Sequence, residues 1–157
     1  MLLAKPLSLL STRYRVFEDG RPVAVIETSR MREAGRLILE EAAYSVYREG
    51  VFFGRYVLEN EDGAVLATAE KPGLFARRFE VEHDGSTTVL RAASLFRRPF
   101  VLTEHGEEVG RIHPVRLLSR SALADLPEAW LPAVRLFMLW LVLLLWRRDS
   151  GGVGGGG

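Results

Sequence analysis

The chain has 157 residues, of which 48% are hydrophobic and 26% are charged, and its formal net charge is +1. This length suits one domain with a substantial core, and the composition excludes an intrinsically disordered chain. The small net charge gives no general attraction to nucleic acid, and the absence of cysteine excludes disulfides, thiolate metal sites and cysteine nucleophiles.

The beginning of the chain is patterned as antiparallel β-strands. Lys5 and Pro6 interrupt the apolar residues at the N-terminus, so these do not form the continuous apolar region of a signal peptide and are predicted to be the first strand. Residues 14–28 contain two β-rich runs separated by Asp19 and Gly20, a pair that accepts the positive φ of a tight hairpin turn.

The same pattern of two β-rich runs around a polar, glycine-ending turn occurs three more times. These later hairpins are predicted at residues 51–70, 75–93 and 100–112. In the second of them Phe79 and Val81 alternate with charged residues, as expected of a strand with one side in water, although Arg77 interrupts the apolar row. Four hairpins in succession predict a meander.

Other β-like segments bring the total to about twelve strands, with the spacing typical of sandwiches and barrels. They lie at residues 36–40, 42–48 and 115–123. Residues 30–35 fit either one helical turn or a loop.

The pattern changes near the C-terminus, where a helix is predicted over residues 131–147. Pro132 suits a first turn, and Arg147 and Arg148 suit a helix C-terminus. Apolar residues occupy every side of this helix, so it must be buried in a protein core or in lipid. The single domain is expected to cover residues 1–149, and the glycine-rich residues 150–157 are expected to form a disordered tail.

Length and charge favour a protein core over lipid. A helix from Pro132 to Trp146 is roughly 22 Å long, whereas the hydrocarbon core of a bilayer is about 30 Å thick. Arg135 lies one turn into the helix, and Arg147 and Arg148 would have to cross the membrane in a tail-anchored protein. The predicted fold is therefore mainly β, a closed antiparallel barrel of roughly twelve strands that encloses the hydrophobic C-terminal helix.

This arrangement resembles the Tubby C-terminal-like superfamily, which includes LURP-one-related proteins and phospholipid scramblases. The opening hairpin is similar to the LURP-one motif through Tyr14, Val16, Asp19 and Gly20. The late hairpin is similar to that family's through Gly106, Val109 and Ile112. The resemblance implies the barrel fold and, from Tubby proteins, binding of phosphorylated lipid headgroups by basic side chains. The chain departs from scramblases because it lacks both an acidic calcium loop beside the helix and a cysteine cluster.

The residue pattern supplies no catalytic or metal site. No serine elbow, phosphate-binding loop or dinucleotide fingerprint is present, so we expect no enzymatic activity, no catalytic residues and no cofactor. His83 and His105 are predicted to be exposed in hairpin turns, and His113 is predicted to lie at a strand end. No metal ligands are assigned.

Four arginines form the candidate ligand site, because guanidinium groups bind phosphate through paired hydrogen bonds. They are Arg77, Arg78, Arg97 and Arg98. The sequence favours a cytoplasmic binding module that recognises anionic phospholipid headgroups at the membrane surface. A soluble domain that binds a protein partner is the alternative, and a tail-anchored membrane protein is the third hypothesis. Nucleic acid is not an expected partner.

Overall fold

The computed structural model describes residues 1–50, 54–73, 77–94 and 98–154, with side chains through Ser150. It confirms the predicted fold class: twelve antiparallel strands close into a barrel, and one helix follows them. The elements are β1 (Leu2–Pro6), β2 (Arg13–Glu18), β3 (Arg21–Thr28), β4 (Ala34–Leu39), β5 (Ala42–Glu49), β6 (Arg55–Glu59), β7 (Val65–Glu70), β8 (Arg78–His83), β9 (Ser86–Ala92), β10 (Phe100–Glu104), β11 (Glu107–Pro114), β12 (Ala122–Asp125) and α1 (Pro132–Gly154).

Each strand pairs with its neighbours in sequence, and β1 closes the barrel by pairing with both β2 and β12. The predicted tight turn at Asp19 and Gly20 is confirmed, since these residues have φ angles of 50° and 78°. Closure leaves no strand edge open for pairing with another chain. The strand alternation in β8 is also confirmed, with Phe79 and Val81 buried and Glu80 exposed.

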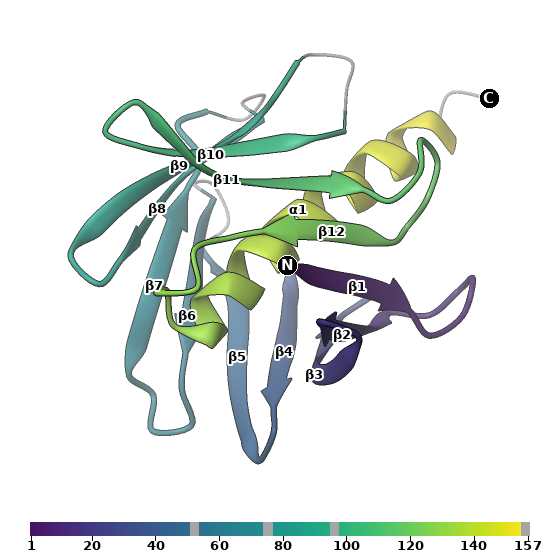
Figure 1. Ribbon diagram of the computed structural model, residues 1–157, viewed down its shortest axis with the longest axis horizontal. Helices are drawn as coiled ribbons and strands as arrows, with labels where there is room; N and C mark the ends of the chain where they lie inside the picture. Colours follow the sequence, from purple (N-terminus) through teal and green to yellow (C-terminus); the bar gives the residue numbers. More distant parts are fainter. Residues whose placement is uncertain (51–53, 74–76, 95–97, 155–157) are drawn as a thin grey trace.

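Helix α1 runs through the barrel (Figure 1), which buries its side chains from Ala133 to Trp146. The side chains from Phe137 to Val142 have no exposed surface, and they join the inward side chains of the strands in one core. The helix and the wall approach closely at Gly35: a Cβ there would overlap the carbonyl oxygen of Glu27 and lie 3.2 Å from Nε1 of Trp140. Among the described residues, no helix is both long and apolar enough to cross a membrane.

Two details differ from the sequence-based expectations. Residues 115–121, predicted as strand, form a loop closed by the bond from the Val115 amide to the Ser121 carbonyl, and β12 begins only at Ala122. Helix α1 continues past 147 to Gly154, so it includes the first part of the expected disordered tail. Of the two alternatives for residues 30–35, the loop describes residues 30–33, which form bends, and β4 begins at Ala34.

The barrel has two dissimilar ends. At the hairpin end lie the β2–β3, β4–β5, β6–β7, β8–β9 and β10–β11 turns, together with the start of α1. At the loop end lie the longer β1–β2, β3–β4 and β11–β12 connections, together with the last turns of α1 (Figure 1). This follows from the antiparallel order of the strands, because successive connections alternate between the two ends.

Candidate functional site at the loop end

The two ends carry opposite charges. The exposed turns of the hairpin end contain carboxylates and, among the described residues, no lysine or arginine: Asp19, Glu40, Glu41, Glu61, Asp62 and Asp84. Most of the charged residues in the connections of the loop end are arginines, among them Arg30, Arg32, Arg98, Arg116 and Arg120. The net charge is only +1, but negative charge collects in the turns of the hairpin end and positive charge in the connections of the loop end.

The loop end also exposes apolar side chains. The described hydrophobic residues that are more than four-fifths exposed all lie in its connections, and we call them the apolar rim: Leu9, Leu10, Met31, Leu117 and Leu118. Single exposed leucines are ordinary, but apolar residues gathered at one end of a molecule mark an interaction surface.

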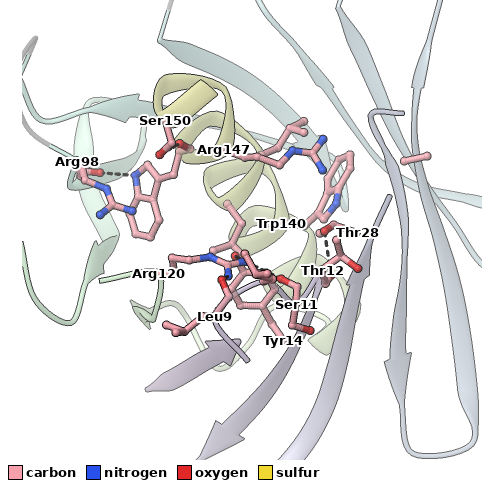
Figure 2. Close-up of a pocket in the computed structure, with 15 residues that line it drawn as sticks. Leu9, Ser11, Thr12, Tyr14, Thr28, Arg98, Arg120, Trp140, Arg147 and Ser150 are labelled. Carbon is pink, nitrogen blue, oxygen red and sulfur yellow. Dashed lines mark hydrogen bonds between the residues drawn. The ribbon is translucent and has the colours of Figure 1, made fainter. Parts of the chain in front are cut away.

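A cavity of about 320 Å³ opens at the same end, between the apolar rim and the last turns of α1. Among the described residues, three arginines line it, and we call it the arginine pocket: Arg98, Arg120 and Arg147. Figure 2 shows Arg98 and Arg147 on opposite sides, with Arg120 between them. No described aspartate or glutamate lines this cavity, whereas Glu18 and Glu40 line a second cavity of about 430 Å³ at the hairpin end.

The arginines of the pocket bond to backbone carbonyls and not to carboxylates. Arg98 donates to the Leu117 carbonyl at 3.3 Å and stacks on the Trp146 ring at 4.4 Å, and Arg147 donates to the Ser29 carbonyl. Arg120 donates to the Ser11 carbonyl at 2.6 Å and joins the β11–β12 loop to the β1–β2 loop. Among the described residues, none of these three guanidinium groups lies within salt-bridge distance of a carboxylate, so no direct ion pair neutralises their charge.

Apart from the arginines, the polar side chains of the pocket wall are indoles and hydroxyls. The Trp140 indole nitrogen is buried without a hydrogen-bond partner in the described structure, and the Trp146 indole donates to the Arg98 carbonyl at 2.9 Å. The Thr28 hydroxyl donates to the Thr12 carbonyl at 2.9 Å. Burial lowers the pKa of the Arg98 guanidinium, with smaller opposing effects of Tyr14 and Asp149. Such a site is electrostatically suited to an anion and unsuited to a cation.

The structure separates the four arginines predicted from the sequence. Arg98 lines the pocket, whereas Arg77 bonds to Asp149 at 2.7 Å and lies over the Phe100 ring. Arg78 lies outside on β8, paired with Glu80 at 2.8 Å. Arg97 falls outside the described residues.

Two arginines of the pocket were not among the predicted site residues. The sequence places Arg147 at the C-terminal end of the helix, where its charge counts against a membrane anchor, and it places Arg120 in a segment predicted to be a strand. The sequence contained a usable signal, because the alternation of hairpin turns and longer loops predicts which connections share an end. This alternation places the connections that carry Arg98, Arg120 and the leucines of the apolar rim at the same end of the barrel.

Charged side chains of α1 bond to the barrel near each end. Arg135 bonds to Glu18 at 2.8 Å near the hairpin end, and Arg148 bonds to Glu33 near the loop end. Glu33 also accepts hydrogen bonds from Arg48 at 3.1 Å and from the Tyr56 hydroxyl at 2.7 Å. These bonds set the axial position of a helix whose middle is entirely apolar.

The prediction that His83 is exposed is wrong, since its side chain is buried inside the barrel near the hairpin end. It continues the alternation of Phe79 and Val81, a signal that was available in the sequence. Thr88 donates its hydroxyl proton to Glu104 at 2.7 Å and therefore accepts from His83 Nε2 at 2.9 Å. The His83 ring also packs edge-on against Trp130 at 4.7 Å.

This burial predicts a pH-dependent stability. Burial lowers the pKa of His83 below 6.5, and the weaker attraction of Glu104 and Asp84 opposes the shift. The unfolded chain therefore takes up a proton near pH 6.5 that the folded protein resists, so stability falls as the pH drops from 6.5 towards the folded pKa. Urea unfolding midpoints between about pH 7.5 and about pH 5 should show this loss in the native protein and a smaller loss in His83→Gln. His105→Asn, in the exposed β10–β11 turn, should behave like the native protein; an unchanged slope in His83→Gln would contradict the assignment.

Within the described part of the chain, no three side chains of histidine, aspartate or glutamate form a group suited to a metal ion. Comparisons of the chain with protein-family models, curated proteins and solved structures found no match.

Proposed function

We propose that this protein is a binding module that docks its loop end on anionic membrane surfaces. The observation that carries the proposal is the coincidence, at one end of a closed barrel, of the apolar rim with the arginines that lack carboxylate partners. No catalytic group is needed for this function.

The apolar rim supports the docking energetically. Leu117 and Leu118 are 84% and 88% exposed, so they contribute little to the fold and lose unfavourable contact with water when they enter a bilayer interface. Burying a leucine side chain fully is worth about 1.5–3 kcal/mol. Leu117 and Leu118 share the β11–β12 loop, which Arg120 joins to the β1–β2 loop that carries Leu9 and Leu10. Together these leucines offer an apolar surface that a lipid interface can accept.

The charge separation supports the orientation. Anionic lipids attract basic residues close to the surface by about 1 kcal/mol each, and they repel the acidic turns of the hairpin end. Exposed Arg32 and Arg116 lie on the loop end with no described carboxylate partner. The barrel is therefore expected to approach an anionic surface with its axis upright and its loop end first.

Vesicle binding tests the proposal. The native protein should sediment with vesicles containing phosphatidylserine, and weakly or not at all with pure phosphatidylcholine vesicles. Changing both Arg32 and Arg116 to glutamate should weaken binding to anionic vesicles by about thirtyfold or more, because at least about 2 kcal/mol of attraction is lost. Changing both Leu117 and Leu118 to serine should weaken binding by about tenfold or more through lost apolar burial.

Matched variants at the hairpin end serve as controls. Arg21→Glu changes an exposed arginine there, and Val65→Ser removes an exposed apolar side chain there. Val65→Ser should bind anionic vesicles as tightly as the native protein. Arg21→Glu should lose less affinity, per unit of charge changed, than the variant with Arg32 and Arg116 changed to glutamate. Equal losses from changes at the two ends, or equal binding to both kinds of vesicle, would contradict docking by the loop end.

A further inference from the structure

The arginine pocket contains chemistry that docking on a surface does not use. Attraction to an anionic surface needs only exposed arginines such as Arg32 and Arg116. The arginine pocket is instead a cavity of about 320 Å³ lined by residues of both the barrel wall and α1. Its volume is at the lower end of the range typical of small-molecule sites. The cavity is therefore large enough for one small ligand.

The polar part of the pocket suits a phosphate group. Arg98 and Arg147 each have guanidinium N–H groups beyond the bond that they make to a carbonyl, and none of the described residues that line the cavity is an aspartate or glutamate that could compete for them. Stacking on Trp146 holds the Arg98 plane in position. A phosphate monoester carries up to two negative charges and three acceptor oxygens, which matches two separated guanidinium groups better than a single carboxylate does.

The remaining lining suits an apolar chain. Leu143 and Leu144 of α1 line one side of the pocket, and Leu9 and Leu10 of the apolar rim line its opening. A ligand that is all phosphate would leave these surfaces without a partner, and a neutral ligand would leave the arginines without one. The complementary ligand has a phosphate head and an apolar chain.

We propose that the arginine pocket binds one molecule of a phosphate monoester with a short alkyl chain, its phosphate between Arg98 and Arg147 and its chain along Leu143 and Leu144. The proposal deepens the proposed function, because a membrane surface presents the same chemistry in its lipids. A soluble alkyl phosphate can nevertheless occupy the pocket without any bilayer, and this separates the two proposals.

Titration calorimetry of the full chain with three soluble probes tests the pocket. Octyl phosphate below its micelle concentration should bind with one site per chain. Inorganic phosphate, which lacks the chain, and octyl glucoside, which lacks the charge, should each bind at least about tenfold more weakly. A change in tryptophan fluorescence should accompany octyl phosphate binding, because Trp140 and Trp146 line the pocket. Equal affinity for octyl phosphate and octyl glucoside would overturn the proposal.

Three variants locate the binding. Arg98→Gln and Arg147→Gln should each weaken octyl phosphate binding by about tenfold or more, since each removes a charged donor. Ala34→Leu should also abolish it, because Ala34 lines the cavity and a larger side chain fills it without changing the charge. Arg116→Gln, on the same end but outside the pocket lining, should leave the affinity unchanged. Unfolding midpoints identify any variant that has lost its fold.

The outcomes for the two proposals are distinguishable. If Ala34→Leu and both arginine variants bind octyl phosphate as the native protein does, the pocket proposal is wrong even when vesicle binding is strong. If Leu117→Ser with Leu118→Ser abolishes vesicle binding but leaves octyl phosphate binding intact, both proposals are supported. If octyl phosphate binds in the pocket and anionic vesicles do not bind, the docking proposal fails and the pocket proposal stands.

Discussion

Replacing Trp140 with alanine should lower the free energy of unfolding by about 3–5 kcal/mol, a large part of the about 5–15 kcal/mol typical of a domain. Trp140 lies at the middle of α1 with no exposed surface. Its ring packs edge-on against Tyr56 at 5.9 Å and stacks on Phe137 at 6.1 Å. The barrel wall is tied by hydrogen bonds around its circumference, so it cannot collapse into the space that the indole leaves, and the cost of the cavity is added to the lost burial.

Urea unfolding followed by circular dichroism measures this loss. Leu118→Ala provides the control, because that leucine is 88% exposed and its truncation should change stability by less than about 0.5 kcal/mol. Trp140→Phe should cost less than Trp140→Ala, since the ring packing is partly kept and the indole nitrogen that lacks a partner is removed. A cost for Trp140→Ala no larger than that for Leu118→Ala would contradict a helix packed inside the barrel.

Glu18→Ala should lower the free energy of unfolding by about 3 kcal/mol, because it leaves the Arg135 charge buried without its partner. The Arg135 side chain is 8% exposed and bonds to Glu18 at 2.8 Å, and its Nε has no hydrogen-bond partner in the described structure. We expect a loss at the lower end of the range of about 3–5 kcal/mol for breaking a buried ion pair, because the Glu18 side chain is 30% exposed and water can approach the site.

Arg135→Met should cost much less, about 1 kcal/mol or less, although it breaks the same ion pair. Methionine removes the buried charge and keeps an apolar side chain of similar length, while the carboxylate of Glu18 is left where water can reach it. The double variant should be about as stable as Arg135→Met alone. Glu108→Ala serves as the exposed control, because its pair with Arg111 lies on the surface and contributes little. Equal costs for Glu18→Ala and Arg135→Met would show that the loss of stability does not come mainly from leaving Arg135 desolvated and unpaired.

These two predictions concern different requirements of the same helix. The apolar middle of α1 supplies the core, and the arginines near its ends keep it in register with the barrel through Glu18 and Glu33. A tail anchor needs a continuous apolar span, whereas an internal helix can end in charges that meet fixed partners on the wall. Arg135, which counted against a membrane span in the sequence, has such a partner in the fold.

Local physics explains why the strands were predictable. The Asp19–Gly20 turn depends on backbone conformations that few residues adopt, and the alternation of Phe79 and Val81 depends on the geometry of one strand. Both signals are complete within a few residues. The same alternation extends to His83 and places its side chain on the inner face, but its position beside a turn favours exposure. The contacts with Thr88 and Trp130 show how the fold accommodates the buried ring.

The sequence predicts the chemistry of the candidate site, an anion site made of arginines, but not which arginines form it. Arginine pairs in the sequence pointed to an anion, and Arg98 does line the pocket. Arg77 instead pairs with Asp149, a residue 72 positions away, and Arg78 pairs with Glu80 on the outer face. Whether an arginine is neutralised depends on which carboxylate the fold brings near it, and adjacency in sequence carries no information about that.

Residues close together in the chain specify the strands and the apolar helix, and the alternation of short turns with longer loops separates the acidic turns from the arginine-rich loops. The folded barrel is needed to pair β1 with β12, to bring Glu18 and Glu33 to the arginines of the helix, and to gather Arg98, Arg120 and Arg147 around one cavity that no described carboxylate lines. Those outcomes depend on closing the barrel around the helix. Closure brings together residues more than a hundred positions apart, such as Arg120 and Ser11, and no local pattern specifies their contact.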